Sequence, residues 1–220
     1  MKVDTFYVPG FWRFQWVVLI TSIVLMSGAM ITIEASLLPI HWNIYGDADR
    51  FADKNLALAL WPVIIFALIL FMKAIARLEK RKDNLKQSKK ATSVVLGSVS
   101  LLLLIIQLFA ILLVLGLIQS FAHWVVCLIS IVFLVMGNFL TKIHSNYSMG
   151  IRTKWTLGDE RVWVKTHRFT SLLIILIAVL SLTSIFWMPP QWLFINVVVF
   201  ILGLLISVPY SYLVHKKLNS

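Results

Sequence analysis

The sequence predicts an all-α integral membrane protein with six transmembrane helices. Of its 220 residues, 60% are apolar and only 13% are charged, and the mean hydropathy is +0.91. A soluble domain usually carries about a quarter charged residues. The apolar residues also form runs of about twenty, the length at which a helix crosses the hydrocarbon layer of a bilayer. The spans must be helical, because a backbone surrounded by lipid has to satisfy its own hydrogen bonds.

Six apolar runs define the expected spans. The third is longer than the hydrocarbon layer requires, so we expect it to tilt or to project into water. Four amide side chains lie in or near these runs, and we interpret them as interhelical hydrogen-bonding groups, with a transport site as the alternative. The expected spans are Phe14–Ile33, Leu56–Ile75, Thr92–Ile118, Phe121–Leu140, Thr170–Trp187 and Trp192–Leu213, and the amides are Gln107, Gln119, Asn138 and Asn196.

The distribution of basic residues predicts the orientation. All but two of the 20 Lys and Arg residues fall on one side of the six-span topology, and the exceptions are Arg50 and Lys54. The positive-inside rule therefore places both termini in the cytoplasm. Because the basic residues flank apolar spans, the net charge of +11 indicates topology and not direct nucleic-acid binding. No charged residue remains for the middle of a span, which argues against an ion-coupled pump.

The chain divides into three expected parts. Residues 1–75 form a two-span N-terminal region with an external loop, and residues 76–118 form a basic cytoplasmic linker and span three. Residues 119–220 form a three-span domain with a long cytoplasmic loop. We expect the basic run Arg77–Lys90 to continue span two as a solvated helix on the anionic inner leaflet. Docking an acidic face of a cytoplasmic protein is the alternative.

The external loop between spans one and two contains aromatic and acidic residues. We expect Pro39 to end any preceding helix, and Asn43–Asp47 to form a turn in which Gly46 takes a positive φ. One interpretation is a rigid amphipathic hairpin on the membrane, and another is a recognition surface for a cationic peptide. A metal site of His41, Asp47, Asp49 and Asp53 is a third, although the spacing is not that of a calcium loop. The candidate recognition residues are Pro39, His41, Trp42, Asn43, Tyr45, Gly46, Asp47 and Asp49.

The cytoplasmic loop from Gly137 to Arg168 is much longer than a simple turn needs. Thr156 and Asp159 predict a capping box that opens a helix over Glu160–Phe169, along the inner interface and into span five. The Arg152 guanidinium suits a phospholipid phosphate, a partner carboxylate or a backbone carbonyl. We interpret His144 and His167 as hydrogen-bonding residues. The candidate residues here are Asn138, Asn146, Tyr147, Gly150, Arg152, Thr153, Trp155, Thr156, Trp163, His167 and Arg168.

The two loops also resemble each other. The segment from Ile40 to Gly46 aligns with the segment from Ile143 to Gly150, with slips of a residue or two. Each follows the first span of a three-span half, so the sequence predicts two inverted three-helix halves, with chance similarity as the alternative.

Both loops together resemble the SdpI family of bacterial membrane proteins. Pro39-x-His41-Trp42-Asn43-x-x-Gly46-x-x-Asp49 is similar to the N-terminal domain of unknown function often fused to them. The cytoplasmic loop is similar to the SdpI domain at Gly137-Asn138, Asn146-Tyr147, Gly150-Ile151-Arg152-Thr153-x-Trp155-Thr156-Leu157, Val162-Trp163 and Thr166-His167-Arg168. The chain departs from the family at Thr141, Lys154 and Thr170-Ser171, where the family usually has proline, proline and glycine.

The resemblance implies an immunity protein in the bacterial cytoplasmic membrane, which protects the cell against a secreted toxic peptide. It also implies, for some members, signalling by a repressor held at the membrane. We expect no enzymatic activity, cofactor or metal, and membrane lipids as partners. A small transporter or lipid-handling protein is the alternative function.

Overall fold

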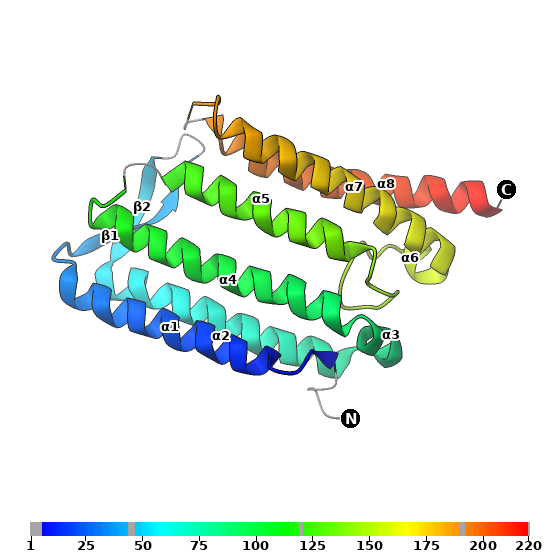
Figure 1. The fold of residues 1–220 in the computed structure, drawn as a ribbon, viewed down its shortest axis with the longest axis horizontal. Coiled ribbons are helices and arrows are strands. Elements are labelled where there is room, and N and C mark those ends of the chain that lie inside the picture. Colours follow the sequence, from blue (N-terminus) through cyan, green and yellow to red (C-terminus); the bar gives the residue numbers. More distant parts are fainter. Residues whose placement is uncertain (1–5, 44–46, 119–120, 190–191, 220) are drawn as a thin grey trace.

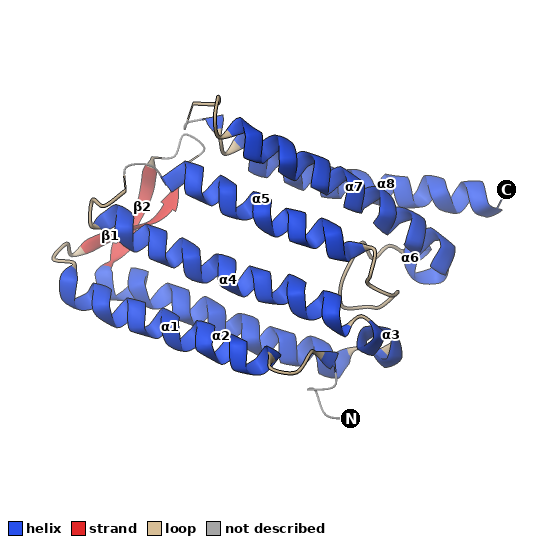
Figure 2. Ribbon diagram, in the orientation of Figure 1, coloured by secondary structure: helices blue, strands red, loops and turns tan. Residues whose placement is uncertain are grey.

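The computed structural model describes residues 6–43, 47–118, 121–189 and 192–219. Within this part of the chain, six helices are long and apolar enough to cross a membrane, and helix accounts for 75% of the structure (Figure 2). The prediction of an all-α protein with six membrane-spanning helices is therefore confirmed. These helices are α1 (Phe11–Thr32), α2 (Lys54–Leu78), α4 (Lys89–Val114), α5 (Phe121–Leu140), α7 (Glu160–Ser184) and α8 (Ile195–Asn219).

The six long helices lie side by side with their axes roughly aligned (Figure 1). Helices α1, α2 and α4 contact one another, and α7 packs between α5 and α8. The α4–α5 contact joins the two groups. Three spans therefore pack together on each side of this contact, as expected for two three-helix halves, and the inverted relation between the halves stays a prediction.

Short elements mark the two ends of the bundle (Figure 1). The strands β1 (Leu37–Trp42) and β2 (Ala48–Asp53) lie at one end, which we call the hairpin end. Helices α3 (Lys82–Gln87) and α6 (Lys154–Gly158) lie at the other, together with the start of α1 and the end of α8. We call this the basic end, and the orientation that puts it in the cytoplasm stays a prediction.

Buried amides connect the helices within the bundle. The Gln107 side chain accepts a hydrogen bond from Ser22 Oγ at 2.6 Å and donates to the Ser22 carbonyl at 2.9 Å. The Gln15 Oε1 accepts from Ser100 Oγ at 2.7 Å. Both amides join α1 to α4, so Gln107 has the interhelical role expected of it.

Of the other three amides, one also connects two helices. Asn196 Nδ2 donates to Ser184 Oγ on α7 at 3.1 Å. Asn138 is exposed on α5, and its side chain has no hydrogen bond in the described part of the chain. Gln119 lies outside the described residues.

Some expected helix boundaries are wrong. The third span ends at Val114 and not at Ile118, because the chain turns at Gly116, where φ is 70°. The basic run Arg77–Lys90 does not continue α2 as one helix. Helix α2 ends at Leu78, and the chain bends before α3 because the Glu79 carboxylate accepts the Arg81 N–H at 2.7 Å.

Candidate functional site

The external loop forms an antiparallel two-stranded sheet. Its register shifts between Pro39 and His41 and again before Trp42. Asn43 closes the turn by donating its N–H to the Asp47 carbonyl at 2.9 Å and accepting the Asp47 N–H at 3.0 Å. Tyr45 and Gly46, including the positive φ expected at Gly46, lie outside the described residues. Pro39 does not end a helix, since α1 already ends at Thr32 and Pro39 pairs with Phe51 in the sheet.

The charged and aromatic residues of the hairpin contact different partners and do not gather at one point. His41 Nδ1 lies 2.6 Å from Asp49 Oδ1, and this hydrogen bond lowers the pKa of the Asp49 carboxyl below 3.8. Asp53 caps α2 by accepting the Asn55 N–H at 2.9 Å. Trp42 packs against the buried cluster that contains Ala110 and Val125. Among the described residues, no three His, Cys, Asp or Glu side chains come together as a metal site would require.

The segments aligned as an inverted repeat have different backbone structures. Ile40 to Trp42 belong to β1, whereas Ile143 to Asn146 form an irregular loop. The two aligned segments therefore do not share a local backbone conformation.

The loop at the basic end is organised around Asn146. This side chain is fully buried and makes three hydrogen bonds to the loop backbone. Its Nδ2 donates to the His144 carbonyl at 2.8 Å, and its Oδ1 accepts the N–H groups of Ser148 and Met149 at 2.8 and 2.7 Å. One amide thus satisfies backbone groups that would otherwise be buried without partners.

The linker after α2 holds this loop from the other side through Glu79, which sequence analysis did not single out. This residue is 2% exposed. It accepts the Tyr147 N–H at 3.1 Å and the Ser148 hydroxyl. Glu79 thus connects the first half of the chain to the loop of the second half.

Three further linker residues complete this contact. Arg81 donates to the Ser145 hydroxyl and, at 2.6 Å, to the Leu157 carbonyl. Asn84 donates to the Ser145 carbonyl at 2.7 Å, and Ser88 Oγ accepts the His144 N–H at 2.9 Å. We call Glu79, Arg81, Asn84 and Ser88 the linker clamp. The sequence signal for it is weak: an acidic residue and polar side chains within a basic run.

A second group of residues connects the loop to α7. His167 Nδ1 lies 2.9 Å from the Trp163 carbonyl, and Nε2 accepts the Ile151 N–H at 3.1 Å. Since a carbonyl only accepts and an N–H only donates, His167 is neutral, with its proton on Nδ1. The rings of His167 and Trp163 stack with 4.0 Å between their centroids, and Trp163 Nε1 donates to the Ile143 carbonyl at 2.8 Å. His167 therefore has the hydrogen-bonding role expected of it.

The predicted capping box of Thr156 and Asp159 is wrong. The short helix α6 intervenes, and Thr156 forms a box with Thr153 that caps α6. Asp159 alone caps α7 by accepting the Arg161 N–H at 2.8 Å. The Arg161 side chain also donates to this carboxylate, which lowers its pKa to about 2. The helix expected over Glu160–Phe169 is the first part of α7 and continues directly into the span.

Other predicted residues lie around Asn146 and the stacked Trp163 and His167 rings. Arg152 uses the third of its predicted partners and donates to the Tyr147 carbonyl. The Tyr147 side chain is exposed and lies under Arg81, with 5.1 Å from the guanidinium carbon to the ring centroid. Trp155 contacts Tyr212 of α8, with 5.0 Å between ring centroids.

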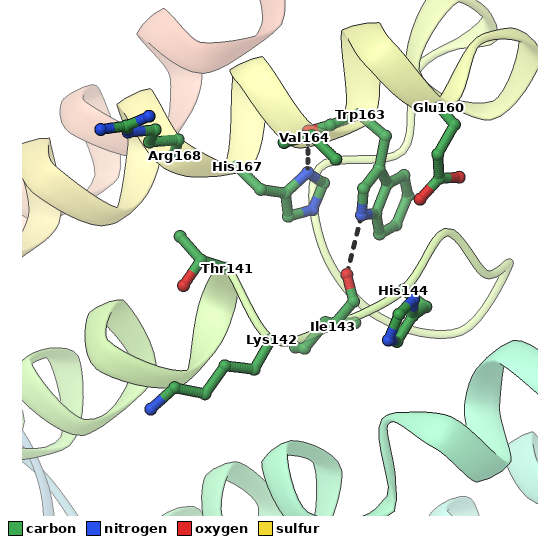
Figure 3. A pocket seen from close by; sticks show the side chains of 9 residues that line it. All are labelled: Thr141, Lys142, Ile143, His144, Glu160, Trp163, Val164, His167 and Arg168. Carbon is green, nitrogen blue, oxygen red and sulfur yellow. Dashed lines mark hydrogen bonds between the residues drawn. The ribbon is translucent and has the colours of Figure 1, made fainter.

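A cavity of about 400 Å³ opens beside this core, between the end of α5 and the start of α7 (Figure 3). Ile143, Trp163 and His167 are its buried residues, and the others are exposed. It is lined by Thr141, Lys142, Ile143, His144, Glu160, Trp163, Val164, His167 and Arg168. Of the predicted site residues, the structure brings Trp163, His167 and Arg168 to this cavity, whereas Asn138 does not line it.

Comparison with known proteins identifies two families that match parts of this chain. Residues 142–212 match the SdpI/YfhL protein family, and residues 37–66 match a domain of unknown function, DUF1648. The predicted resemblance to the SdpI family is therefore confirmed over residues 142–212. The chain's relative "Immunity protein SdpI" of Bacillus subtilis (strain 168) is 29% identical over 184 residues, which cover 83% of this chain and 85% of that protein. No solved structure matches the chain.

The two matched ranges lie at different ends of the bundle. The SdpI/YfhL range begins at the cavity and runs through α6, α7 and most of α8, while the other contains the hairpin and the first half of α2. The linker clamp lies outside both ranges. The linker between the two matched ranges therefore contacts the loop around Asn146 through the linker clamp.

Proposed function

We propose that this protein is an immunity protein of the bacterial cytoplasmic membrane, which protects the cell against a secreted antimicrobial peptide without enzymatic activity. The supporting observation is the similarity to the Bacillus subtilis immunity protein over 83% of the chain, with both family segments present in order. Six apolar helices and a multi-pass membrane location are consistent with this role.

In this proposal the hairpin end meets the incoming peptide. The Asp49 carboxyl, whose pKa the hydrogen bond to His41 lowers, is ionised at neutral pH as an ordinary aspartate is, so it offers negative charge to a cationic peptide. Phe51, two residues further along the same strand, is 56% exposed and offers apolar contact. The two-stranded sheet also has outer edges to which an extended peptide can add a strand.

The basic end carries the response. Tyr147 and Arg152 are exposed on the loop that the linker clamp holds. A cytoplasmic partner, of which a repressor is the type that the family resemblance implies, binds this surface. For a signal to pass, the peptide must bind one arrangement of the bundle more tightly than another. The linker clamp is the contact whose rearrangement changes the exposure of the loop.

A survival assay tests the proposal. The gene is deleted in its host, and the cells are challenged with a panel of secreted antimicrobial peptides. We expect the deletion to sensitise cells to a cognate peptide and the wild-type gene to restore survival. The Asp47→Asn/Asp49→Asn variant is expected to lose most of this protection, while Asp83→Asn at the opposite end keeps it.

Unchanged survival of the deletion strain across the panel would contradict immunity. If the hairpin variant protected fully, the hairpin would not be the peptide-binding surface. The alternative of a transporter or lipid-handling protein receives no support from the amides that suggested it. Gln107 and Asn196 are both engaged in hydrogen bonds between helices.

A further inference from the structure

The cavity beside Trp163 lies at the basic end of the bundle, between the end of α5 and the start of α7 (Figure 3). Lys142 follows the last residue of α5 by two positions. Arg168 is the last charged residue of α7, and the helix continues from Phe169 to Ser184 with apolar and hydroxyl side chains only. A change from charged to apolar side chains along a helix is expected where the headgroups of a bilayer meet the hydrocarbon.

Positive charge is concentrated on one side of the cavity. Figure 3 shows Lys142, Thr141 and Arg168 on one side of the cavity and Glu160 and His144 on the other, with the Lys142 ammonium and the Arg168 guanidinium both pointing outward. Both cations are exposed, and neither has a hydrogen-bond or ion-pair partner among the described residues. The Lys142 ammonium lies 4.4 Å from the centroid of the Phe139 ring. Two unneutralised cations and a hydroxyl are suited to a phosphate group, which a guanidinium can bind through two hydrogen bonds.

The polar groups on the inner wall of the cavity already have hydrogen-bond partners within the protein. Both ring nitrogens of His167 are used, one toward Trp163 and one toward Ile151. The Trp163 N–H is used by the Ile143 carbonyl. These side chains therefore shape the cavity, and the polar contacts of a ligand fall to the residues at the rim.

An apolar row on α7 continues from the cavity toward the hairpin end. Leu172, Leu176 and Leu180 follow Arg168 at intervals of four residues, so they lie along one face of the helix. They are 65%, 56% and 58% exposed. A ligand with its phosphate at Arg168 can lay an acyl chain along this row, which favours a phospholipid over a free phosphate ion.

We propose that this cavity is a phospholipid-binding site. The phosphate lies at the rim that carries Thr141, Lys142 and Arg168, with the two cationic side chains turned toward it, and an acyl chain covers Leu172, Leu176 and Leu180. The ligand class is a membrane phospholipid with net negative charge. Glu160 on the opposite rim repels a second anionic group, so one headgroup occupies the cavity.

Lipid binding to the full-length protein in detergent micelles tests this site. Titration followed by native mass spectrometry compares short-chain phosphatidylglycerol with the diacylglycerol of the same chains and with inorganic phosphate. We expect phosphatidylglycerol to bind at least about tenfold more tightly than either. The Lys142→Gln/Arg168→Gln variant is expected to lose about 30-fold in affinity, because each cation near an anionic lipid contributes about fivefold. The matched control is Lys165→Gln/Lys216→Gln, which removes two exposed cations of the same end that do not line the cavity.

Three results would overturn the assignment. Equal affinity of the double variant and the wild type would exclude a role of these two cations. An equal loss in the control would indicate general charge attraction. Equal binding of inorganic phosphate or of diacylglycerol would exclude a site that reads both parts of a lipid. No toxic peptide is involved, so the result is independent of the proposed immunity function.

Discussion

Gly150 is the position where a single methyl group should disturb the loop at the basic end most. Its φ is 100°, a conformation that L-residues rarely adopt. A Cβ atom at this position would lie 2.3 Å from His167 Nε2 and 3.2 Å from the edge of the Trp163 ring. Since both rings are at most 2% exposed, they have little room to move.

The expected cost of Gly150→Ala has two parts. The positive φ costs a residue with a Cβ about 1–2 kcal/mol. Displacing His167 removes the acceptor of the Ile151 N–H, and a buried donor without a partner costs about 1–3 kcal/mol. The free energy of unfolding should therefore fall by about 2–5 kcal/mol.

Titration of the purified protein with SDS in mixed micelles measures this change. Gly158→Ala is the matched control, because its Cβ would have no heavy atom within 4 Å and its φ is not positive. It should stay within about 0.5 kcal/mol of the wild type. In a His167→Ala background, Gly150→Ala should cost only the part due to φ, about 1–2 kcal/mol.

A Gly150→Ala change of less than about 0.5 kcal/mol would refute the reasoning, because that value is expected where no steric conflict exists. An equal cost in both backgrounds would show that the conflict with His167 is not its cause.

Three further changes test other contacts. Glu79→Gln keeps the shape of the side chain but places an amide N–H₂ against groups that donate to the carboxylate. The free energy of unfolding, measured by SDS titration, should therefore fall by about 1–3 kcal/mol. The exposed control Asp83→Asn should lower it by less than about 0.5 kcal/mol. Asp159→Asn should lower the melting temperature by a constant amount from pH 5 to 8. A lowered pKa stabilises above the ordinary value of 3.8, and this contribution is lost as the pH falls through about 2, where the two proteins should melt alike. A double-mutant cycle of Gln107→Leu and Ser22→Ala should give a coupling energy of about 0.6 kcal/mol between the two side chains.

Each of these predictions has a contradicting result. Equal stability of the Glu79 and Asp83 variants would show that the linker clamp contributes nothing. A melting difference for Asp159→Asn that persists near pH 2 would mean that the charge is not responsible. A coupling energy of zero between Gln107 and Ser22 would exclude their hydrogen bond as a link between α1 and α4.

The sequence by itself determined the class of the protein, the number of spans and the start of α7 at Glu160. These are local properties, since hydropathy over about twenty residues decides whether a segment crosses a bilayer. The motifs of the two loops were likewise sufficient to indicate the family. Local reasoning failed at Thr156, where a capping signal was assigned to the wrong helix because a five-residue helix lay between.

Only the tertiary structure decided how the basic end is held together. Glu79 binds residues 68 and 69 positions away along the chain, and nothing near it in the sequence marks such a partner. The tautomer of His167 depends on a backbone N–H from another segment, and the cavity exists only where α5 and α7 meet. The physical reason is that hydropathy is carried by each residue alone, whereas a hydrogen bond or a cavity belongs to groups that folding brings together.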